Sequence, residues 1–125
     1  MVPIVVATVA AIALTINPAL AAQVNYYDVT NGAHPHDVAP APDGKVWYTA
    51  QSQGALGILD PKTRELIQVP LGADSPPHGV IVGPDRAAWI TDGGQNAIAR
   101  YDPTTKAVKL FRLPKEFPNA NLNTA

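Results

Sequence analysis

The stretch Gly-Ala-His-Pro-His-Asp, residues 32–37, gathers two imidazoles and a carboxylate within four positions. Such side chains can hold a metal ion, or can move a proton, since the unperturbed pKa of histidine lies near neutral pH. His-x-His alone is a weak metal signal. What His34, His36 and Asp37 can do therefore depends on the elements that position them.

These residues fall within an internal repeat of period 42. Residues 35–76 align without a gap with residues 77–118, and 14 of the 42 positions are identical, where unrelated segments would share about three. The identical pairs are Pro35/Pro77, His36/His78, Val38/Val80, Pro42/Pro84, Asp43/Asp85, Trp47/Trp89, Thr49/Thr91, Gln53/Gln95, Ala55/Ala97, Asp60/Asp102, Pro61/Pro103, Thr63/Thr105, Leu71/Leu113 and Pro76/Pro118. His36 thus recurs as His78, whereas His34 aligns with Pro76, so the pair of histidines is not itself a repeated motif.

A period of 40 to 45 residues made of short β-type runs is typical of a four-stranded propeller blade. The chain is therefore predicted to be all-β, a partial β-propeller of about two blades. The predicted strands lie near 36–41, 45–50, 55–60 and 65–71, and again near 78–83, 87–92, 97–102 and 107–113. We assign one blade to residues 34–75, a second to 76–117 and the start of another to 118–125.

Turn residues support this division. Pro42-Asp43-Gly44 suits a tight hairpin, and Asp60-Pro61 and Asp102-Pro103 place Asp and Pro as a type I turn requires. Pro84-Asp85-Arg86 lacks the glycine. We interpret these residues as structural, and we expect Trp47 and Trp89 to pack between neighbouring blades rather than to form a ligand platform.

The first 22 residues differ from the rest of the chain. No charged side chain occurs from Val2 to Ala22, and Ala19-Leu20-Ala21 provides the small-x-small pattern of a signal peptidase site. We predict a signal peptide in residues 1–22, cleaved after Ala21 or Ala22, and hence a secreted or periplasmic protein. No Lys or Arg precedes the apolar run, which leaves an uncleaved anchor as the alternative.

Charge and cysteine content exclude several classes of function. The formal net charge is −1 and the basic residues are scattered, so we expect no nucleic-acid partner and no membrane contact beyond the signal segment. There is no cysteine, which excludes a disulfide framework, a thiolate zinc site and a cysteine nucleophile.

Residues 23–33 align with the fourth strand of the repeat, as an orphan outer strand. A propeller ring is commonly closed by pairing an amino-terminal strand with the last blade, and repeat arrays generally need three or more units. We therefore expect this sequence to be the amino-terminal part of a longer propeller, inactive and poorly folded by itself.

The segments HPHDVAPAPDGKVWYTAQ, SPPHGVIVGPDRAAWITD and DPTTKAVKLFRLP resemble the blades of the streptogramin lyase family, the virginiamycin B lyases. The resemblance covers about 100 residues, and it implies a monomeric seven-bladed propeller. It also implies a lyase that opens the lactone of a cyclic depsipeptide by elimination and requires Mg²⁺. The family's catalytic histidines occupy the recurring Pro-His position in later blades, so this chain provides no assigned catalytic residue and no assigned metal ligand.

Three residues are candidates for the substrate-facing rim of the central channel: His36, His78 and Asp92. Each histidine opens the innermost strand of its blade, where it serves the structure, contacts substrate or binds a metal. Asp92 ends a second strand and could turn toward the same rim, or could instead cap a loop. The alternative to a lyase is a non-catalytic propeller that binds a small molecule, a glycan or a protein partner.

Overall fold

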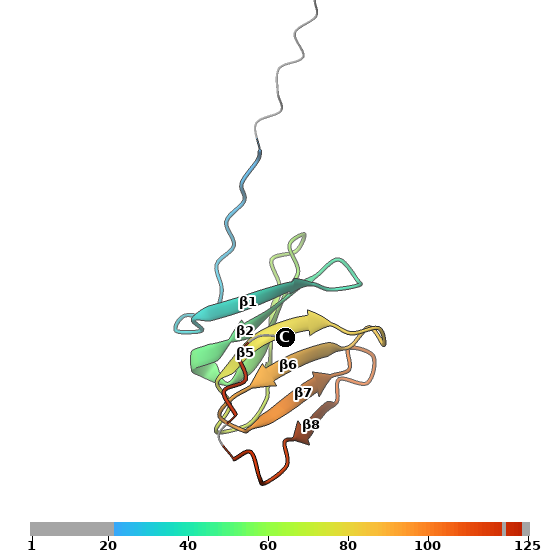
Figure 1. The fold of residues 1–125 in the computed structure, drawn as a ribbon. Helices are drawn as coiled ribbons and strands as arrows, with labels where there is room; N and C mark the ends of the chain where they lie inside the picture. The colour runs from blue at the N-terminus through green and yellow to red at the C-terminus, as the bar shows by residue number, and fades with distance from the viewer. Residues whose placement is uncertain (1–21, 119, 124–125) are drawn as a thin grey trace, which may run out of the picture.

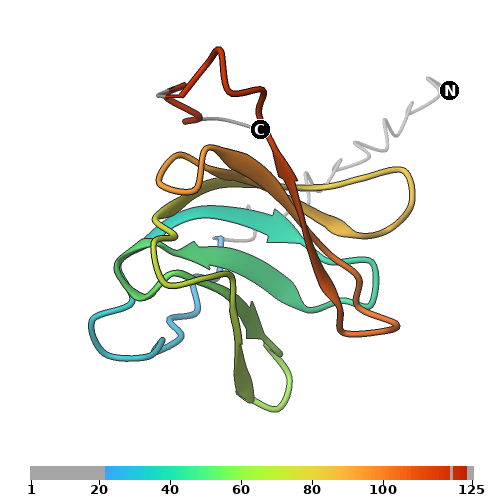
Figure 2. The same cartoon turned by 90° about the horizontal axis from the view of Figure 1, so that it is seen from below.

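The computed structural model describes residues 22–118 and 120–123. These residues form two four-stranded antiparallel sheets, ordered β1-β2-β3-β4 and β5-β6-β7-β8 (Figures 1 and 2). The strands of blade 1 are β1 (Pro35–Pro40), β2 (Val46–Ala50), β3 (Ala55–Leu59) and β4 (Leu66–Pro70). Those of blade 2 are β5 (Pro77–Val82), β6 (Ala88–Asp92), β7 (Ala97–Tyr101) and β8 (Val108–Arg112). Each predicted strand is present within one or two residues of its expected bounds, and the all-β prediction is confirmed.

The 42-residue period is preserved in the strand register. Trp47 pairs with Ala39 and Ile58, and its counterpart Trp89 pairs with Ile81 and Arg100. Both innermost strands carry a bulge at the same place, between Pro35 and Val38 and between Pro77 and Val80. The sequence repeat is therefore a repeat of three-dimensional structure, down to this irregularity.

The main core lies between the two blades. Strand residues alternate between the two faces of a sheet, so Trp47 and Thr49 of β2 face blade 2, while Ala88 and Ile90 of β6 face blade 1. The buried residues of this cluster are Ala39, Ala41, Trp47, Leu56, Ile58, Leu71, Val80, Ala88, Ile90, Ala99 and Tyr101. The prediction that a repeated tryptophan packs between blades is confirmed for Trp47, which is 2% exposed.

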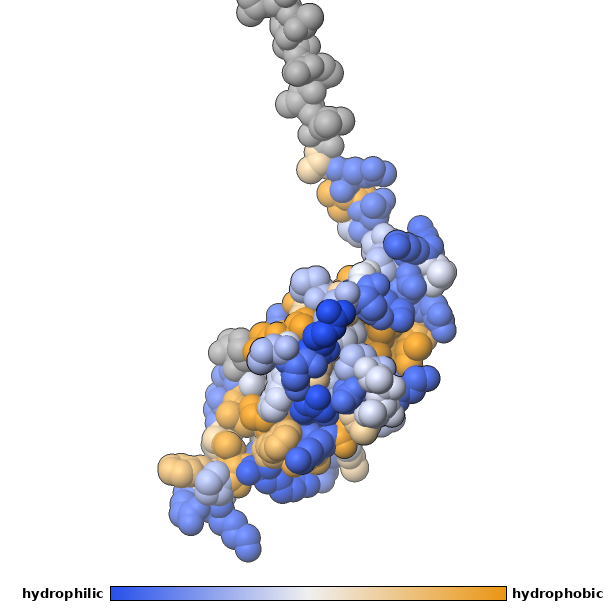
Figure 3. Space-filling view, turned by 90° about the vertical axis from the view of Figure 1, so that its right-hand side faces the viewer, coloured by the Kyte–Doolittle hydropathy of each residue, from blue (hydrophilic) through white to orange (hydrophobic). Residues whose placement is uncertain are grey.

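The far face of each blade is less completely covered. Trp89 lies on the face of blade 2 turned away from blade 1, where it stacks on Phe111 at 5.5 Å and borders an apolar pocket with Ile81 and Ile98. Figure 3 shows such apolar patches among polar surface on the side that it draws. A neighbouring blade on this face stays a prediction.

The amino-terminal segment covers part of the opposite face, that of blade 1. Its first described residues extend away from the sheets (Figures 1 and 3), and Tyr27 and Val29 pack against a second cluster that includes Tyr48 and Leu59. Residues 23–33 form no strand here, in contrast to the orphan strand that we predicted. The partner predicted for that strand is the last blade of a ring, so ring closure stays a prediction. The predicted signal peptide lies, except for Ala22, outside the described residues, and none of the described helices is long and apolar enough to span a membrane.

The turns behave as their residues predict. Asp60 Oδ1 accepts hydrogen bonds from the backbone N–H groups of Lys62 and Thr63, and Asp102 repeats these bonds in blade 2. Gly44 has a φ of 85°, and Arg86, which replaces it in blade 2, adopts a φ of 63°. The hairpin therefore keeps its left-handed residue even where the glycine is missing.

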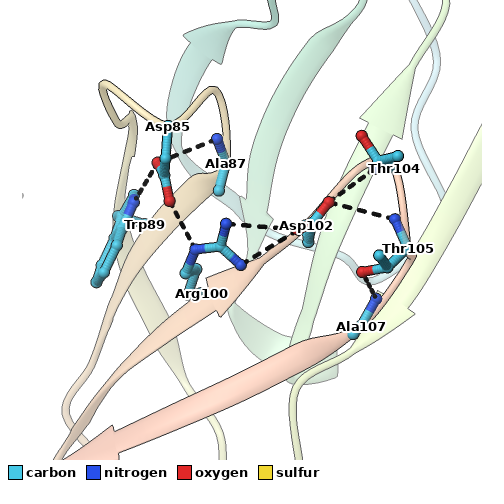
Figure 4. Close-up of polar contacts among 8 residues, drawn as sticks. All are labelled: Asp85, Ala87, Trp89, Arg100, Asp102, Thr104, Thr105 and Ala107. Atoms are coloured by element: carbon cyan, nitrogen blue, oxygen red, sulfur yellow. Dashed lines mark hydrogen bonds and ion pairs between the residues drawn. The ribbon is translucent and has the colours of Figure 1, made fainter.

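An acidic residue in the turn between β5 and β6 makes side-chain hydrogen bonds to two strands of blade 2 (Figure 4). Asp85 accepts hydrogen bonds from Trp89 Nε1 at 3.0 Å and from Arg100 Nε at 2.7 Å. These two donors lower the pKa of Asp85 from 3.8 to about 2. The depressed pKa means that the ionised carboxylate is favoured by folding.

This shift predicts an acid-sensitive contribution to stability. Because the folded-state pKa is depressed, the contribution is complete above pH 3.8 and is lost as the pH falls toward 2. Asp85→Asn should therefore flatten the dependence of stability on pH between about 4 and 2. Denaturant midpoints measured from pH 2 to 7 test this, with the exposed Glu116→Gln as control. Parallel curves for wild type and Asp85→Asn would contradict it.

Candidate functional site

The structure brings the two repeated histidines together. His36 lies on β1 and His78 on β5, the innermost strands of the two blades, which run side by side (Figure 1). Their ring centroids are 3.6 Å apart, with the ring planes inclined by 41°. His36 is exposed and His78 is half-buried, so the pair is partly accessible to solvent. His34 lies in the preceding loop and is not part of this pair.

A repeated threonine joins these two inner strands. The bulge in β1 leaves the N–H of Asp37 outside the sheet ladder, and Thr49 Oγ1 accepts it at 3.0 Å. The same hydroxyl donates to the backbone carbonyl of His78 in the next blade at 2.8 Å. Thr91 Oγ1 likewise accepts the N–H of Gly79 at 2.8 Å. One hydroxyl thus satisfies the bulge of its own blade and fixes the histidine-bearing strand of the next.

Asp37 adds a second link across the same seam. Its Oδ2 accepts the N–H of Val80 in blade 2 at 2.9 Å, while Oδ1 accepts the N–H of Val38. Val80 is 2% exposed, so its N–H has no ready access to water as a replacement partner. Asp37 therefore serves as a clamp between the blades, and it holds in place the strand that bears His78.

Removal of this clamp is expected to be costly. Asp37→Ala should destabilise the protein by about 1–3 kcal/mol, because it leaves the buried Val80 N–H without an acceptor. Chemical denaturation followed by tryptophan fluorescence measures the loss. The matched control is Asp74→Ala, an exposed aspartate in the loop between the blades. Equal stability of the two variants would show that the Asp37–Val80 bond contributes nothing.

Asp92 does not take the rim position that we predicted for its side chain. It is fully buried, and its two oxygens accept hydrogen bonds from Gln95 N at 3.0 Å and from Gln95 Nε2 at 2.6 Å. Gln95 Nε2 also donates to the carbonyl of Leu71, which lies in the connection between the blades. The local sequence Asp-Gly-Gly-Gln folds the carboxylate back onto its own loop. Asp92 thus caps the loop, which was the alternative interpretation.

A pocket of about 380 Å³ opens beside His78. Gln51 of blade 1, His78 and the Gly93-Gly94 loop of blade 2 line it, and residues 120–123 form its other wall. Gly94 packs so closely on Pro76 and Asp74 that a Cβ at this position would have no room. The pocket combines an imidazole with amide groups and bare backbone, which suits recognition of a polar or peptide-like ligand.

The described residues do not fit a Mg²⁺ site. Mg²⁺ prefers carboxylate and other oxygen ligands in near-octahedral geometry. Within residues 22–118 and 120–123, no three His, Cys, Asp or Glu side chains converge on one point. The nearby carboxylates Asp37 and Asp92 are engaged by backbone N–H groups and by Gln95. No chemical step can therefore be assigned to a metal held by these blades.

Sequence reasoning missed the function of two residues at this site. Thr49 was visible as an identity with Thr91, but the repeat alone does not reveal that its hydroxyl crosses to the next blade. Asp37 had no such signal, because Gly79 occupies its place in blade 2. Its contact with Val80 joins residues 43 positions apart and appears only when the two sheets are placed together.

Two packed four-stranded blades with their innermost strands adjacent define a segment of a β-propeller. Comparison with solved structures then identifies the propellers that this chain resembles. It is similar to virginiamycin B lyase from Staphylococcus aureus, with 25% identity and a TM-score of 0.71 over 78% of this chain and 33% of that one. A streptogramin B lyase structure follows with 23% identity and a TM-score of 0.65, over 70% and 30% of the two chains. The resemblance predicted from the repeats is confirmed.

The comparisons also mark the limits of this likeness. The chain spans about a third of the length of the lyase structures that it matches. Hydrazine synthase from Kuenenia stuttgartiensis is similar as well, with 18% identity and a TM-score of 0.58 over 74% of this chain and 27% of that one, which shows the fold alone. No family model matches the sequence, and no curated protein matches it either.

Proposed function

We propose that these blades form part of the ligand-binding rim of a propeller lyase that acts on a cyclic depsipeptide or a related lactone. The observation that carries the proposal is the 25% identity and 0.71 TM-score to virginiamycin B lyase, together with the repeated Pro-His at the inner edge. A catalytically inactive variant of that lyase was crystallised with quinupristin, so a protein of similar structure binds a small molecule.

In the proposed reaction a general base removes the proton on the carbon α to a carbonyl. The electron pair forms a carbon–carbon double bond and the lactone C–O bond breaks, which leaves a carboxylate. No water is consumed, so the opened product is an isomer of the substrate. The base and any Mg²⁺ ligands would come from other blades. His36 and His78 would contact the substrate by hydrogen bonding, with His78 held in place by Thr49 and Asp37.

The test is incubation of the protein with a streptogramin B antibiotic, followed by mass spectrometry. A ring-opened product of unchanged mass supports a lyase, and a product heavier by one water indicates hydrolysis instead. Chelation with EDTA followed by Mg²⁺ addition tests the metal requirement. Absence of any opened product from a protein that carries all its blades would overturn the proposal.

A non-catalytic binding propeller is the second candidate. It is favoured by the engagement of Asp37 and Asp92 in protein contacts, which leaves the described part of the rim with imidazoles and amides but no uncommitted carboxylate. Calorimetric binding of quinupristin that is lost in the His36→Ala/His78→Ala variant, with no turnover by wild type, would favour this candidate.

We also propose that the protein is exported. The proposal rests on the uncharged segment from Val2 to Ala22 and its small-residue cleavage pattern. Amino-terminal sequencing of the protein recovered outside the cytoplasm should begin at Ala22 or Gln23. A product that still begins at Met1 would contradict cleavage and would favour the anchor.

A further inference from the structure

A second groove lies at the end of the blades away from the histidines. His36 lies at the beginning of β1, and the other end of β1 leads into the turn that contains Asp43. The groove and the histidine pair therefore lie at opposite edges of the sheets. The groove measures about 350 Å³ and is bordered by turns of both blades. Its polar lining residues are Asp43, Trp47, Asp85, Arg86, Asp102 and Thr104.

Trp47 is the residue that sets this groove apart. In blade 2 the corresponding indole N–H of Trp89 donates to Asp85, the aspartate of its own hairpin. Trp47 has the equivalent aspartate, Asp43, but that carboxylate instead accepts from Lys45 Nζ at 3.0 Å. The two copies of this sequence motif therefore differ in the hydrogen-bond partner of the tryptophan.

One missing methyl group explains the difference. Trp89 lies against Gly83, where a Cβ would come within 3.0 Å of both Trp89 Nε1 and Asp85 Oδ1. Blade 1 has Ala41 at the position of Gly83. The methyl group of Ala41 thus prevents the Trp47 side chain from adopting the conformation of Trp89. The Trp47 N–H therefore does not reach Asp43, the aspartate of its own hairpin.

The Trp47 side chain forms part of the wall of the groove. The side chain is 2% exposed, and within the described part of the chain no hydrogen bond from Trp47 Nε1 is found. This nitrogen is also not among the buried polar atoms that are sealed from solvent without a partner. The residues that line the groove include Trp47, so a ligand bound there can meet this N–H.

The remaining lining groups define the ligand. Asp43, Asp85 and Asp102 offer acceptor oxygens, while Trp47, Arg86 and Thr104 offer donors. Lys45 pairs with Asp43, and Arg100 pairs with Asp85 and Asp102, as Figure 4 shows for Arg100. Arg86 also lines the groove, so three positive charges accompany the three carboxylates. A hydroxyl can accept from an indole N–H and donate to a carboxylate at once. From this geometry we propose that the groove binds a polyhydroxylated ligand, a single sugar residue, through Trp47 and Asp102.

The two indole resonances of the ¹⁵N-labelled protein report on this site, because the chain has two tryptophans. We expect the Trp47 signal, assigned with Trp47→Phe, to shift saturably with at least one of D-glucose, D-galactose, D-mannose or D-glucosamine at millimolar concentration, while Trp89 moves little. Butylamine, which offers only a cation, should not shift it. No response to any sugar, or equal shifts of both signals, would overturn the proposal.

Matched variants separate binding from turn stability. Asp102→Ala and Asp60→Ala remove the same turn hydrogen bonds, but Asp60 lies outside the groove. Asp102→Ala should weaken sugar binding at least about tenfold and Asp60→Ala should leave it unchanged. Ala41→Gly should release Trp47 to donate to Asp43 and abolish the response. Equal binding by Asp102→Ala and Asp60→Ala would contradict the assignment of Asp102.

Discussion

Trp47→Ala is expected to destabilise the protein by about 3–5 kcal/mol, the range for deletion of a large aromatic side chain from a packed core. Trp47 is 2% exposed and contributes to the cluster between the two blades, so its removal leaves a cavity in a closely packed core. The seam between the blades should open in this variant, and the contact of His36 with His78 should be lost with it.

The repeat provides the control. Trp89→Ala removes the same side chain at the equivalent position of blade 2, but Trp89 is half-buried and faces away from blade 1. Its loss should cost about 1–2 kcal/mol, including the hydrogen bond to Asp85. Urea unfolding followed by circular dichroism compares the two variants, and Trp47→Phe provides a milder step if Trp47→Ala does not fold. Equal losses from Trp47→Ala and Trp89→Ala would contradict our description of the core.

The contrast between Trp47 and Trp89 shows which features of the structure can be predicted from the sequence. Period, strand positions and turn chemistry are local or repeated properties, so alignment of the chain with itself was enough to predict two blades and the equivalent positions of His36 and His78 in them. The repeat alone does not predict which of Trp47 and Trp89 is buried, because both occupy the same position of the 42-residue unit. Their difference in burial depends on which blade face meets a neighbour, and this is a property of the assembled sheets.

The candidate site was only partly predictable for the same reason. Asp92 ends its strand at a position that could have faced the rim, but Gln95, three residues later, binds both carboxylate oxygens and turns them inward. Asp37 appeared unimportant because its counterpart is Gly79, yet it makes a buried contact across the seam. Local spacing placed each carboxylate on the correct strand, whereas its partners were determined by side-chain packing and by the second sheet.

A glycine in β3 is expected to be required as long as Tyr48 lies beside it, for a reason that the repeat also explains. Gly57 lies against the ring of Tyr48, and a Cβ at this position would come within 3.0 Å of three ring carbons. Blade 2 has the opposite combination, Ile90 with Ala99, and both are fully buried. A large ring over glycine in one blade and a smaller side chain over alanine in the other fill the same space, so the two pairs are alternative solutions to one packing problem.

Gly57→Ala should therefore destabilise the protein by about 1–3 kcal/mol through overpacking. Tyr48→Ile/Gly57→Ala, which copies the pair of blade 2 into blade 1, should recover most of that loss, because the smaller side chain leaves room for the added methyl group. A double-mutant cycle of urea unfolding free energies, with Tyr48→Ile as the second single variant, measures this coupling. If the effects of the two substitutions simply add, the close approach of Tyr48 to Gly57 does not determine which residue β3 can carry there.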